Sequence, residues 1–225
     1  MSFFTRPCQA ILFDLDGTLL DTAADLGLAL NTMLVERNMP PLPYELIRPL
    51  ASHGSHGLLS AGFGAAYTAA STAQQAQLKS EFLTRYGQNV CVKTTWFDGV
   101  EALLSQLNNQ GIVTGIITNK PEQFTQPIVA SFPLLAQMPV VVSGDTLTVA
   151  KPHPEPLLYA AQKINVASAQ CWYVGDAERD IISGRAAGMT TFVAECGYIS
   201  STDTPETWGA DYHIAHPEEL LQIAP

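Results

Sequence analysis

Two patterns of apolar and polar residues alternate along the chain. Short apolar runs that are rich in β-branched and aromatic residues have the length of buried strands. These runs are residues 10–13, 112–117, 140–142, 171–174, 191–194 and 212–214. Segments between the later runs place apolar residues at helical spacing, so we expect helices there. The expected helices are residues 99–109, 122–131, 154–164 and 178–187, with a last one that begins near Pro217.

Strands and helices alternate from about residue 97 onward, and the strands are continuously apolar. Strands of this kind are buried on both faces, which is typical of a parallel sheet whose connecting helices cover both sides. The pattern therefore predicts an α/β fold with a doubly wound, Rossmann-like parallel sheet.

Residues 19–92 do not follow this alternation, because they contain no convincing strand. Helices are expected at about 22–38, 44–50 and 73–88. The Gly- and His-rich stretch from residue 51 to 64 is expected to be too irregular for one long helix. A block of this length, placed after the first strand, fits a small helical second domain.

The chain has 225 residues, enough for one large domain or two modest ones. Its 11 Lys and Arg residues against 21 Asp and Glu residues give a formal net charge of −10. This charge argues against nucleic acid or an anionic membrane surface as the main partner. A small anionic substrate is compatible with it, because a bound divalent cation can reverse the local field.

The cysteines and the N-terminal residues indicate in which cellular compartment the protein is expected. The four cysteines, Cys8, Cys91, Cys171 and Cys196, show no metal-ligand spacing, and we expect them to be reduced. No sustained apolar segment precedes Asp14, so no signal peptide is expected, and no segment approaches transmembrane length. We expect a cytoplasmic protein without a membrane partner, either a monomer or a homodimer.

The end of the first strand carries the strongest chemical signal. Asp14 and Asp16 follow the apolar run directly, and Gly17 and Thr18 turn the chain. Residues i and i+2 of an extended segment point to the same side, so both carboxylates would face one small volume. Two like charges that close are unfavourable unless a cation or a shared proton relieves them. A strand end with two solvated acids is the ordinary alternative, and the Gly-Thr turn behind a buried strand favours the reactive pair.

Other candidate residues share this position in the fold. Thr118 and Asp176 each lie just past a predicted strand, and Lys151 lies in a loop before a helix. Carboxyl ends of strands in open α/β sheets form ligand crevices where the strand order reverses, so these side chains are expected to meet. Each has an ordinary alternative: Thr118 could end its strand, Lys151 could be solvated, and Asp176 could cap the following helix. Asp180 could be a first-turn acid favoured by the helix dipole.

Four motifs in this order resemble the phosphatases of the haloacid dehalogenase superfamily, within them the phosphoglycolate phosphatase group. The motifs are DLDGT at 14–18, TNKP at 118–121, KP at 151–152 and GDAERD at 175–180. Their joint order and spacing make the resemblance specific, and it covers the whole chain. Residues 197–220 (GYISSTDTPETWGADYHIAHPEEL), with 118–129, also resemble a bacterial branch that includes N-acetylmuramic acid 6-phosphate phosphatases.

The resemblance implies a core domain of residues 1–18 and 97–225 and a helical cap domain of residues 19–96. Its hinges would lie near residues 19–21 and 94–98. A cap of this kind closes over the site and excludes water, so it is expected to carry substrate specificity.

The implied reaction is Mg²⁺-dependent hydrolysis of a small phosphorylated metabolite through an aspartyl-phosphate. Asp14 would attack phosphorus, and Asp16 would protonate the leaving alkoxide and later take a proton from water. Asp14, Asp176 and the backbone carbonyl of Asp16 form an oxygen-only set that suits Mg²⁺. The family often has a second acid directly after the first acid of the last motif. Ala177 stands there, so we assign to Asp180 a water-mediated metal role that also orients Lys151.

The remaining residues of the motifs are expected to hold the phosphate. Lys151 would neutralise charge on the transferring group. The Thr118 hydroxyl and the Asn119 backbone amide would bind phosphate oxygens, together with Gly17 and Thr18.

Two residues of the helical insert, Arg48 and His53, are candidates for substrate contact. Arg48 could pair with a carboxylate or second anion of the substrate, and His53 lies in the stretch ASHGSHG, with His56. A surface arginine and solvated histidines are the alternative.

The resemblance leaves the leaving group open. A phosphoglycolate phosphatase is the first expectation, an N-acetylmuramic acid 6-phosphate phosphatase of cell-wall recycling the second, and a sugar-phosphate mutase of the same fold the third. The first two substrates both carry a carboxylate, so Arg48 would not discriminate between them, whereas pocket volume would. A hydrolytic dehalogenase needs no metal, and the presence of Asp16 and Asp176 argues against it. A non-enzymatic binding module would be expected to lack one of the charged residues, and none is missing.

Overall fold

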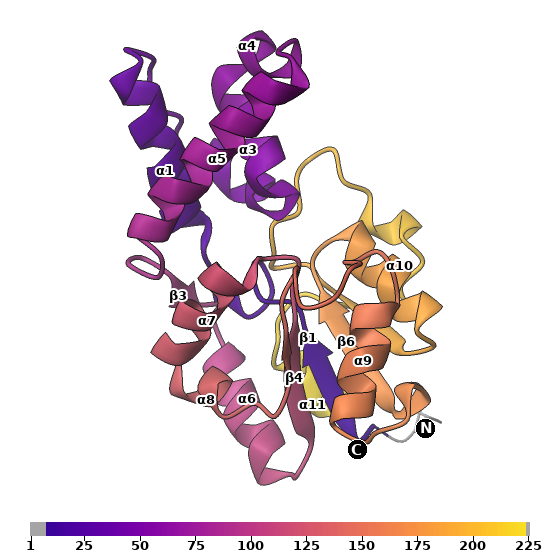
Figure 1. Cartoon of the computed structure of the whole chain (residues 1–225). Coiled ribbons are helices and arrows are strands. Elements are labelled where there is room, and N and C mark those ends of the chain that lie inside the picture. The colour runs from indigo at the N-terminus through magenta and orange to yellow at the C-terminus, as the bar shows by residue number, and fades with distance from the viewer. Residues whose placement is uncertain (1–7, 224–225) are drawn as a thin grey trace.

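The computed structural model describes residues 8–223, which form a sheet flanked by helices and a second group of helices above it (Figure 1). Residues 1–7 and 224–225 of the expected core domain lie outside this range, as does the start of the segment inspected for a signal peptide. Between residues 8 and 223, no helix combines the length and the hydropathy needed to cross a membrane.

The main sheet has six strands, and every neighbouring pair is parallel. They are β1 (Ala10–Phe13), β4 (Val113–Ile117), β5 (Val141–Val142), β6 (Cys171–Gly175), β7 (Thr190–Ala194) and β8 (Tyr212–Ile214). The spatial order is β5-β4-β1-β6-β7-β8, so the chain leaves β1 toward one edge and leaves β6 toward the other. The strand order therefore reverses between β1 and β6, where a ligand crevice is expected.

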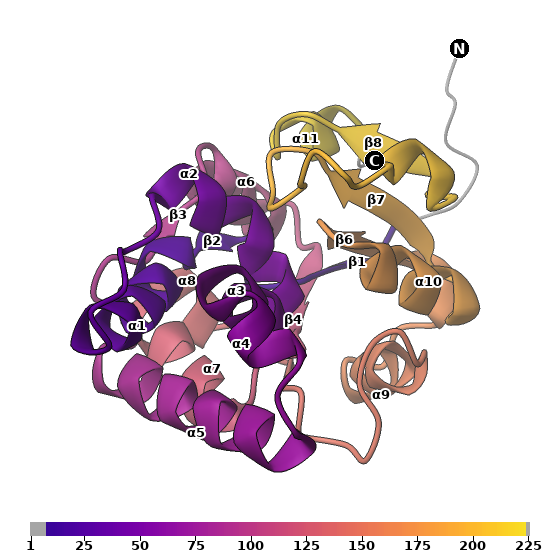
Figure 2. The ribbon, with the colours of Figure 1, turned by 90° about the horizontal axis from the view of Figure 1, so that it is seen from above.

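Side chains of β1 alternate between two hydrophobic cores. Ile11 and Phe13 pack with α6 (Val100–Asn109) and α11 (Glu219–Ile223), whereas Ala10 and Leu12 pack with α9 (Glu155–Lys163). Figure 2 shows α9 and α10 (Glu178–Ala186) on one side of the strands and α6 and α11 on the other. The predicted doubly wound parallel sheet is confirmed. The remaining helical segments of this part are α7 (Glu122–Ser131), α8 (Pro133–Ala136), η2 (Ser168–Gln170) and η3 (Pro205–Thr207).

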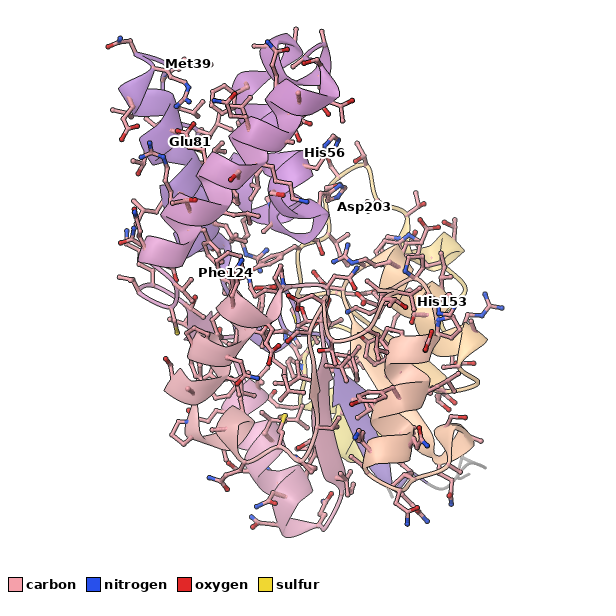
Figure 3. The ribbon with its side chains drawn as sticks, viewed as in Figure 1. Met39, His56, Glu81, Phe124, His153 and Asp203 are labelled. Atoms are coloured by element: carbon pink, nitrogen blue, oxygen red, sulfur yellow. The ribbon has the colours of Figure 1, made fainter. Side chains whose placement is uncertain are left out.

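A group of helices lies above the carboxyl ends of the strands, inserted after β1 as predicted (Figures 1 and 2). It contains α1 (Ala23–Glu36), α2 (Tyr44–Ile47), η1 (Arg48–His53), α3 (Gly54–Phe63), α4 (Ala65–Thr68) and α5 (Thr72–Gln88). We call residues 23–88 the cap. Salt bridges of 2.6 Å join the end of α1 to α5, one from Arg37, the residue after α1, to Glu81 and one from Arg85 to Glu36. Figure 3 labels Glu81 on α5. The domain boundaries given above for the sequence remain a prediction.

The Gly-rich stretch is more regular than the sequence suggested, because residues 54–63 form the helix α3. Its glycines allow close packing. A Cβ atom on Gly62 would lie 2.8 Å from Leu30 of α1, and one on Gly57 would lie 2.4 Å from the Cβ of His53. The stretch is nevertheless not one long helix, as expected, because Gly54 and Gly64, with φ of +62° and +53°, separate α3 from η1 and from α4. The sequence analysis did not foresee α3 itself, whose glycines serve contacts between helices.

Two connections join the cap to the sheet. β2 (Leu20–Asp21) pairs with β3 (Thr95–Trp96) in an antiparallel ribbon. The expectation of no strand in residues 19–92 was therefore wrong for the two-residue β2, which is too short to form an apolar run. The buried Asp25 carboxylate of α1 accepts hydrogen bonds of 2.7–3.1 Å from the backbone amides of residues 92–94 and from the Thr94 hydroxyl. This carboxylate therefore ties the returning linker to the first cap helix.

Replacement of Asp25 is expected to destabilise the protein. In Asp25→Asn the side chain loses its charge and presents an N–H to backbone donors, so the free energy of unfolding should fall by about 2–4 kcal/mol. Urea denaturation measures this loss, with the exposed Asp98→Asn as the matched control. A loss below about 0.5 kcal/mol for Asp25→Asn would show that the carboxylate does not hold the linker.

Candidate active site

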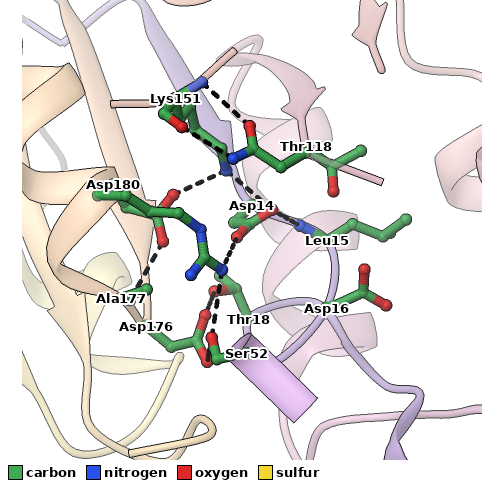
Figure 4. Close-up of polar contacts among 12 residues, drawn as sticks. Asp14, Leu15, Asp16, Thr18, Ser52, Thr118, Lys151, Asp176, Ala177 and Asp180 are labelled. Carbon is green, nitrogen blue, oxygen red and sulfur yellow. Dashed lines mark hydrogen bonds and ion pairs between the residues drawn. The ribbon is translucent and has the colours of Figure 1, made fainter. Parts of the chain in front are cut away.

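The sequence-predicted residues meet at the carboxyl ends of three neighbouring strands (Figure 4). Asp14 directly follows β1, Thr118 follows β4 and Asp176 follows β6. Lys151 reaches the same place from the loop before α9, and all four side chains are buried. The site thus lies at the reversal of strand order, beneath the cap.

The Lys151 ammonium stands between two carboxylates. Its Nζ lies 3.0 Å from Asp14 Oδ1 and 2.7 Å from Asp180 Oδ1, and it donates to the Ile117 carbonyl and the Tyr173 hydroxyl at 2.8 Å each. The side chain has no solvent exposure, so the alternative of a solvated loop lysine is excluded. Tyr173, which the sequence analysis treated only as part of a strand, also bonds to Asp180 at 3.3 Å.

Asn119 fixes the backbone of Lys151 through its side chain. Its Oδ1 accepts from the Lys151 amide at 3.0 Å, and its Nδ2 donates to the Lys151 carbonyl at 2.9 Å. The loop from β4 and the loop before α9 are therefore held together. The predicted phosphate contact of the Asn119 backbone amide remains a prediction.

Three buried carboxylates form the acidic part of the site. Asp14, Asp176 and Asp180 each offer an oxygen atom within 4.8 Å of the others, a grouping that could hold a metal ion. Burial raises the pKa of Asp14 to about 6, against the lowering effect of Lys151. Burial, with the charges of Asp14 and Asp180, raises the pKa of Asp176 to about 7. This excess of negative charge is what a divalent cation would relieve.

The three carboxylates differ in how far their oxygens are already used. Both oxygens of Asp180 are engaged, Oδ1 by Lys151 and Oδ2 by the Ala177 amide at 3.1 Å. Asp176 Oδ2 accepts from the Tyr198 amide at 2.9 Å, and its Oδ1 accepts a longer bond of 3.4 Å from Thr18. The Asp180 oxygen that contacts Lys151 therefore orients the ammonium toward Asp14. Both oxygens of Asp176 are also engaged, since its Oδ2 accepts a second hydrogen bond from Ser52, so the assignment of direct and water-mediated metal ligands remains a prediction.

Gly17 allows the loop after β1 to approach Asp176. Its φ is +83°, and a Cβ atom there would lie 2.1 Å from Asp176 Oδ2. Only glycine fits both the left-handed backbone and this contact. Any side chain at this position would displace Asp176 from the acidic group.

Asp16 has a cation of its own. Its Oδ1 lies 2.9 Å from Lys120 Nζ and also accepts a hydrogen bond from the Thr22 hydroxyl. The two carboxylates of the first motif are therefore relieved by two different lysines, Lys151 for Asp14 and Lys120 for Asp16. Sequence reasoning missed Lys120, although it stands inside the TNKP motif, because nothing in the motif identifies its partner.

The cap contributes Ser52 to the site. Its hydroxyl donates to Asp176 Oδ2 at 3.2 Å and accepts from Arg179 Nη2 at 3.3 Å, and that nitrogen lies 4.0 Å from Asp14 Oδ2 (Figure 4). Neither Ser52 nor Arg179 was singled out from the sequence. Ser52 belongs to the stretch ASHGSHG, and Arg179 lies inside the last motif.

The two cap residues predicted to contact substrate, Arg48 and His53, differ in their surroundings. Arg48 donates to the carbonyls of Cys196 at 2.9 Å and Gly197 at 3.2 Å, with its Nε 3.5 Å from Asp21 Oδ2. Its guanidinium also lies over the rings of Phe97 and Tyr198, 5.5 and 5.4 Å from their centroids. His53 is exposed at the start of α3. Contact of either residue with substrate remains a prediction.

The comparisons with known proteins agree with the geometry. Residues 11–194 match the family model of haloacid dehalogenase-like hydrolases. A phosphoglycolate phosphatase of Xanthomonas campestris pv. campestris is 44% identical over 216 residues, which cover 96% of each chain. An N-acetylmuramic acid 6-phosphate phosphatase of Pseudomonas aeruginosa is 36% identical and covers 96% of this chain and 94% of its own.

Among solved structures, a predicted phosphoglycolate phosphatase from Haemophilus somnus 129pt has a TM-score of 0.84 at 27% identity. The alignment covers 98% of this chain and 99% of that one. The resemblance seen in the motifs is confirmed. This chain belongs to the haloacid dehalogenase-like hydrolase family and is a phosphatase of that family.

Proposed function

We propose that the protein is a Mg²⁺-dependent phosphomonoester hydrolase that acts on a small phosphorylated metabolite through an aspartyl-phosphate. The observation that carries this proposal is the buried Asp14 carboxylate, held by Lys151 at the reversal of strand order with Asp176 beside it. A nucleophile in this place divides the difficult hydrolysis of a phosphate ester into two easier steps.

The proposed steps use residues of this chain only. An Asp14 oxygen attacks phosphorus and displaces the substrate alkoxide, which takes a proton from Asp16. Asp16 then accepts a proton from water as that water attacks the phosphorus of the aspartyl-phosphate, and inorganic phosphate and free Asp14 result. Lys151 and Thr118 stabilise the oxygens of the transferring group.

The donor set fits Mg²⁺, because its members are oxygens and two of them belong to buried carboxylates with raised pKa values. Asp14, Asp176 and the backbone carbonyl of Asp16 would hold the ion, with Asp180 acting through water. When bound, the ion supplies positive charge to the transferring phosphoryl group.

We propose phosphoglycolate phosphatase activity as the specific function, since the relative at 44% identity carries that name. N-acetylmuramic acid 6-phosphate is the second candidate, because a relative at 36% identity carries that name over nearly the same length. We also propose a cytoplasmic location, supported by four free cysteines, two of them buried.

Phosphate release from a panel of substrates tests the function. We expect Mg²⁺-dependent release from 2-phosphoglycolate or N-acetylmuramic acid 6-phosphate above hexose phosphates and nucleotides. Asp14→Asn should lower the rate by at least about 10³-fold, because the nucleophile is removed. Phosphate release that survives Asp14→Asn would refute Asp14 as the nucleophile. No phosphate release from either 2-phosphoglycolate or N-acetylmuramic acid 6-phosphate would refute the proposed substrates.

The pH dependence of the stability of the metal-free protein tests whether the acidic group raises the pKa of Asp176. Asp ionises near pH 4 when unfolded and near pH 7 at position 176 of the folded chain, so the folded state binds this proton more tightly. The free energy of unfolding therefore falls as the pH rises from about 4 to 7, and the full loss is present above pH 7. Asp176→Asn should remove this loss and raise Tm at pH 8 by about 4 °C, on the order of 1–2 kcal/mol.

Calorimetry of both proteins at pH 8 and pH 5 makes the comparison, with Asp98→Asn as control. The difference should shrink at pH 5, where Asp176 is protonated in wild type. Millimolar Mg²⁺ should raise the Tm of wild type at pH 8 but not that of Asp176→Asn. An Asn variant that is less stable than wild type at pH 8, or that keeps the Mg²⁺ shift, would contradict this account.

The sequence analysis expected Arg48 to pair with a carboxylate of the substrate. Its contacts instead favour a bridge between cap and core, because all three nitrogens of the guanidinium already have partners in the protein. Arg48→Met should then lower kcat/KM about equally, roughly 10-fold, for 2-phosphoglycolate and for glycerol 3-phosphate, which has no carboxylate. Steady-state kinetics on both substrates distinguish these two roles of Arg48. A loss of kcat/KM confined to 2-phosphoglycolate would show that Arg48 pairs with the carboxylate of the substrate.

A further inference from the structure

The Asp16 side chain is held by one of its two oxygens. Lys120 and the Thr22 hydroxyl both bind Oδ1, and between residues 8 and 223 no hydrogen bond reaches Oδ2. A carboxylate fixed in this way has its second oxygen free for another partner. In the proposed reaction that partner is the oxygen of the leaving group.

Lys120 connects Asp16 to the cap. Its Nζ lies 2.9 Å from Asp16 Oδ1 and donates to the Tyr86 hydroxyl at 2.9 Å, with the Tyr86 ring centroid 4.8 Å away. The lysine side chain is only 6% exposed, so these contacts take the place of water around the ammonium. Lys120 lies in the loop between β4 and α7, whereas Tyr86 lies in α5 of the cap.

Tyr86 is itself packed against the core. It is buried, and its ring meets that of Phe124 edge to face with centroids 5.2 Å apart. Phe124 stands in the first turn of α7, below the lower end of α5 (Figure 3). The hydroxyl of Tyr86 is therefore set over Lys120 by a contact between cap and core, and a displacement of the cap would remove it.

We infer that Lys120 and Tyr86 are positioning residues for Asp16. Lys120 fixes the carboxylate so that its free oxygen faces the leaving group, and Tyr86 holds Lys120 there only while the cap is closed. The acid that protonates the leaving alkoxide is thus aligned at the moment when water is excluded. This inference rests on the proposed function, since it assigns the proton transfer to Asp16.

The way kcat/KM depends on the leaving group distinguishes positioning of Asp16 from a purely structural role of Lys120 and Tyr86. An alkoxide needs the proton of Asp16, whereas p-nitrophenolate is stable enough to leave without it. The parameter kcat/KM covers the steps through departure of the leaving group, so the later action of Asp16 on water does not enter. A misplaced Asp16 should therefore slow alkyl phosphates selectively.

Tyr86→Phe is the first test, because it removes the hydroxyl and keeps the ring against Phe124. We expect kcat/KM for 2-phosphoglycolate, or for N-acetylmuramic acid 6-phosphate if that is the preferred alkyl ester, to fall about 10-fold. The value for p-nitrophenyl phosphate should change by less than about 2-fold. Lys120→Met should show the same selectivity with a loss of about 100-fold.

Tyr67→Phe is the matched control, since Tyr67 is also a buried cap tyrosine and its hydroxyl contacts His56 at 3.1 Å, away from the site. Its ratio of alkyl to aryl activity should equal that of wild type. Equal losses on both esters in Tyr86→Phe, or no loss on either, would overturn the inference. Wild-type activity on the alkyl esters, measured in the same assay, tests the proposed function separately.

Discussion

The buried ion pair of Lys151 with Asp14 and Asp180 is the interaction on which the rest of the site depends. Two carboxylates at this depth would repel one another and resist burial, and the ammonium between them relieves both effects. Its placement requires the loop before α9 to return to the end of β4, where Asn119 holds its backbone. A buried ion pair contributes little to stability compared with apolar packing, so on our proposal its value lies in presenting a charged nucleophile next to a cation.

The same charges explain why the site suits a phosphate ester. Asp14, Asp176 and Asp180 stand against Lys151 and Arg179, which leaves one negative charge when all are ionised. The raised pKa values of Asp14 and Asp176 are the response of the protein to that excess. On our proposal a divalent cation reverses the balance to one positive charge, and a phosphate dianion then enters a site of opposite sign. Asp16 stays outside this balance, because it lies against a lysine of its own, Lys120.

The sequence predicted the sheet and the positions of Asp14, Thr118 and Asp176, because strand ends follow from apolar runs and parallel strands end at one edge. It could not predict α3, because glycines that allow close packing look the same in a sequence as glycines that break a helix. Contacts such as Ser52 with Asp176 or Tyr86 with Lys120 join segments far apart in the chain. They depend on where the cap sits, and no local pattern of residues encodes that placement.

Among residues 8–223, three hydrogen-bonding cap residues contact the core beside the acidic residues. Ser52 bonds to Asp176, Tyr86 receives Lys120 beside Asp16, and Arg48 holds the carbonyls of Cys196 and Gly197. That last segment belongs to the site as well, since a Cβ atom on Gly197 would lie 2.3 Å from the Cβ of Asp176. A cap that only covered the substrate would need none of these bonds. Because each contact ends on one of these acidic residues or on a group packed against one, the position of the cap and the arrangement of the carboxylates depend on the same contacts.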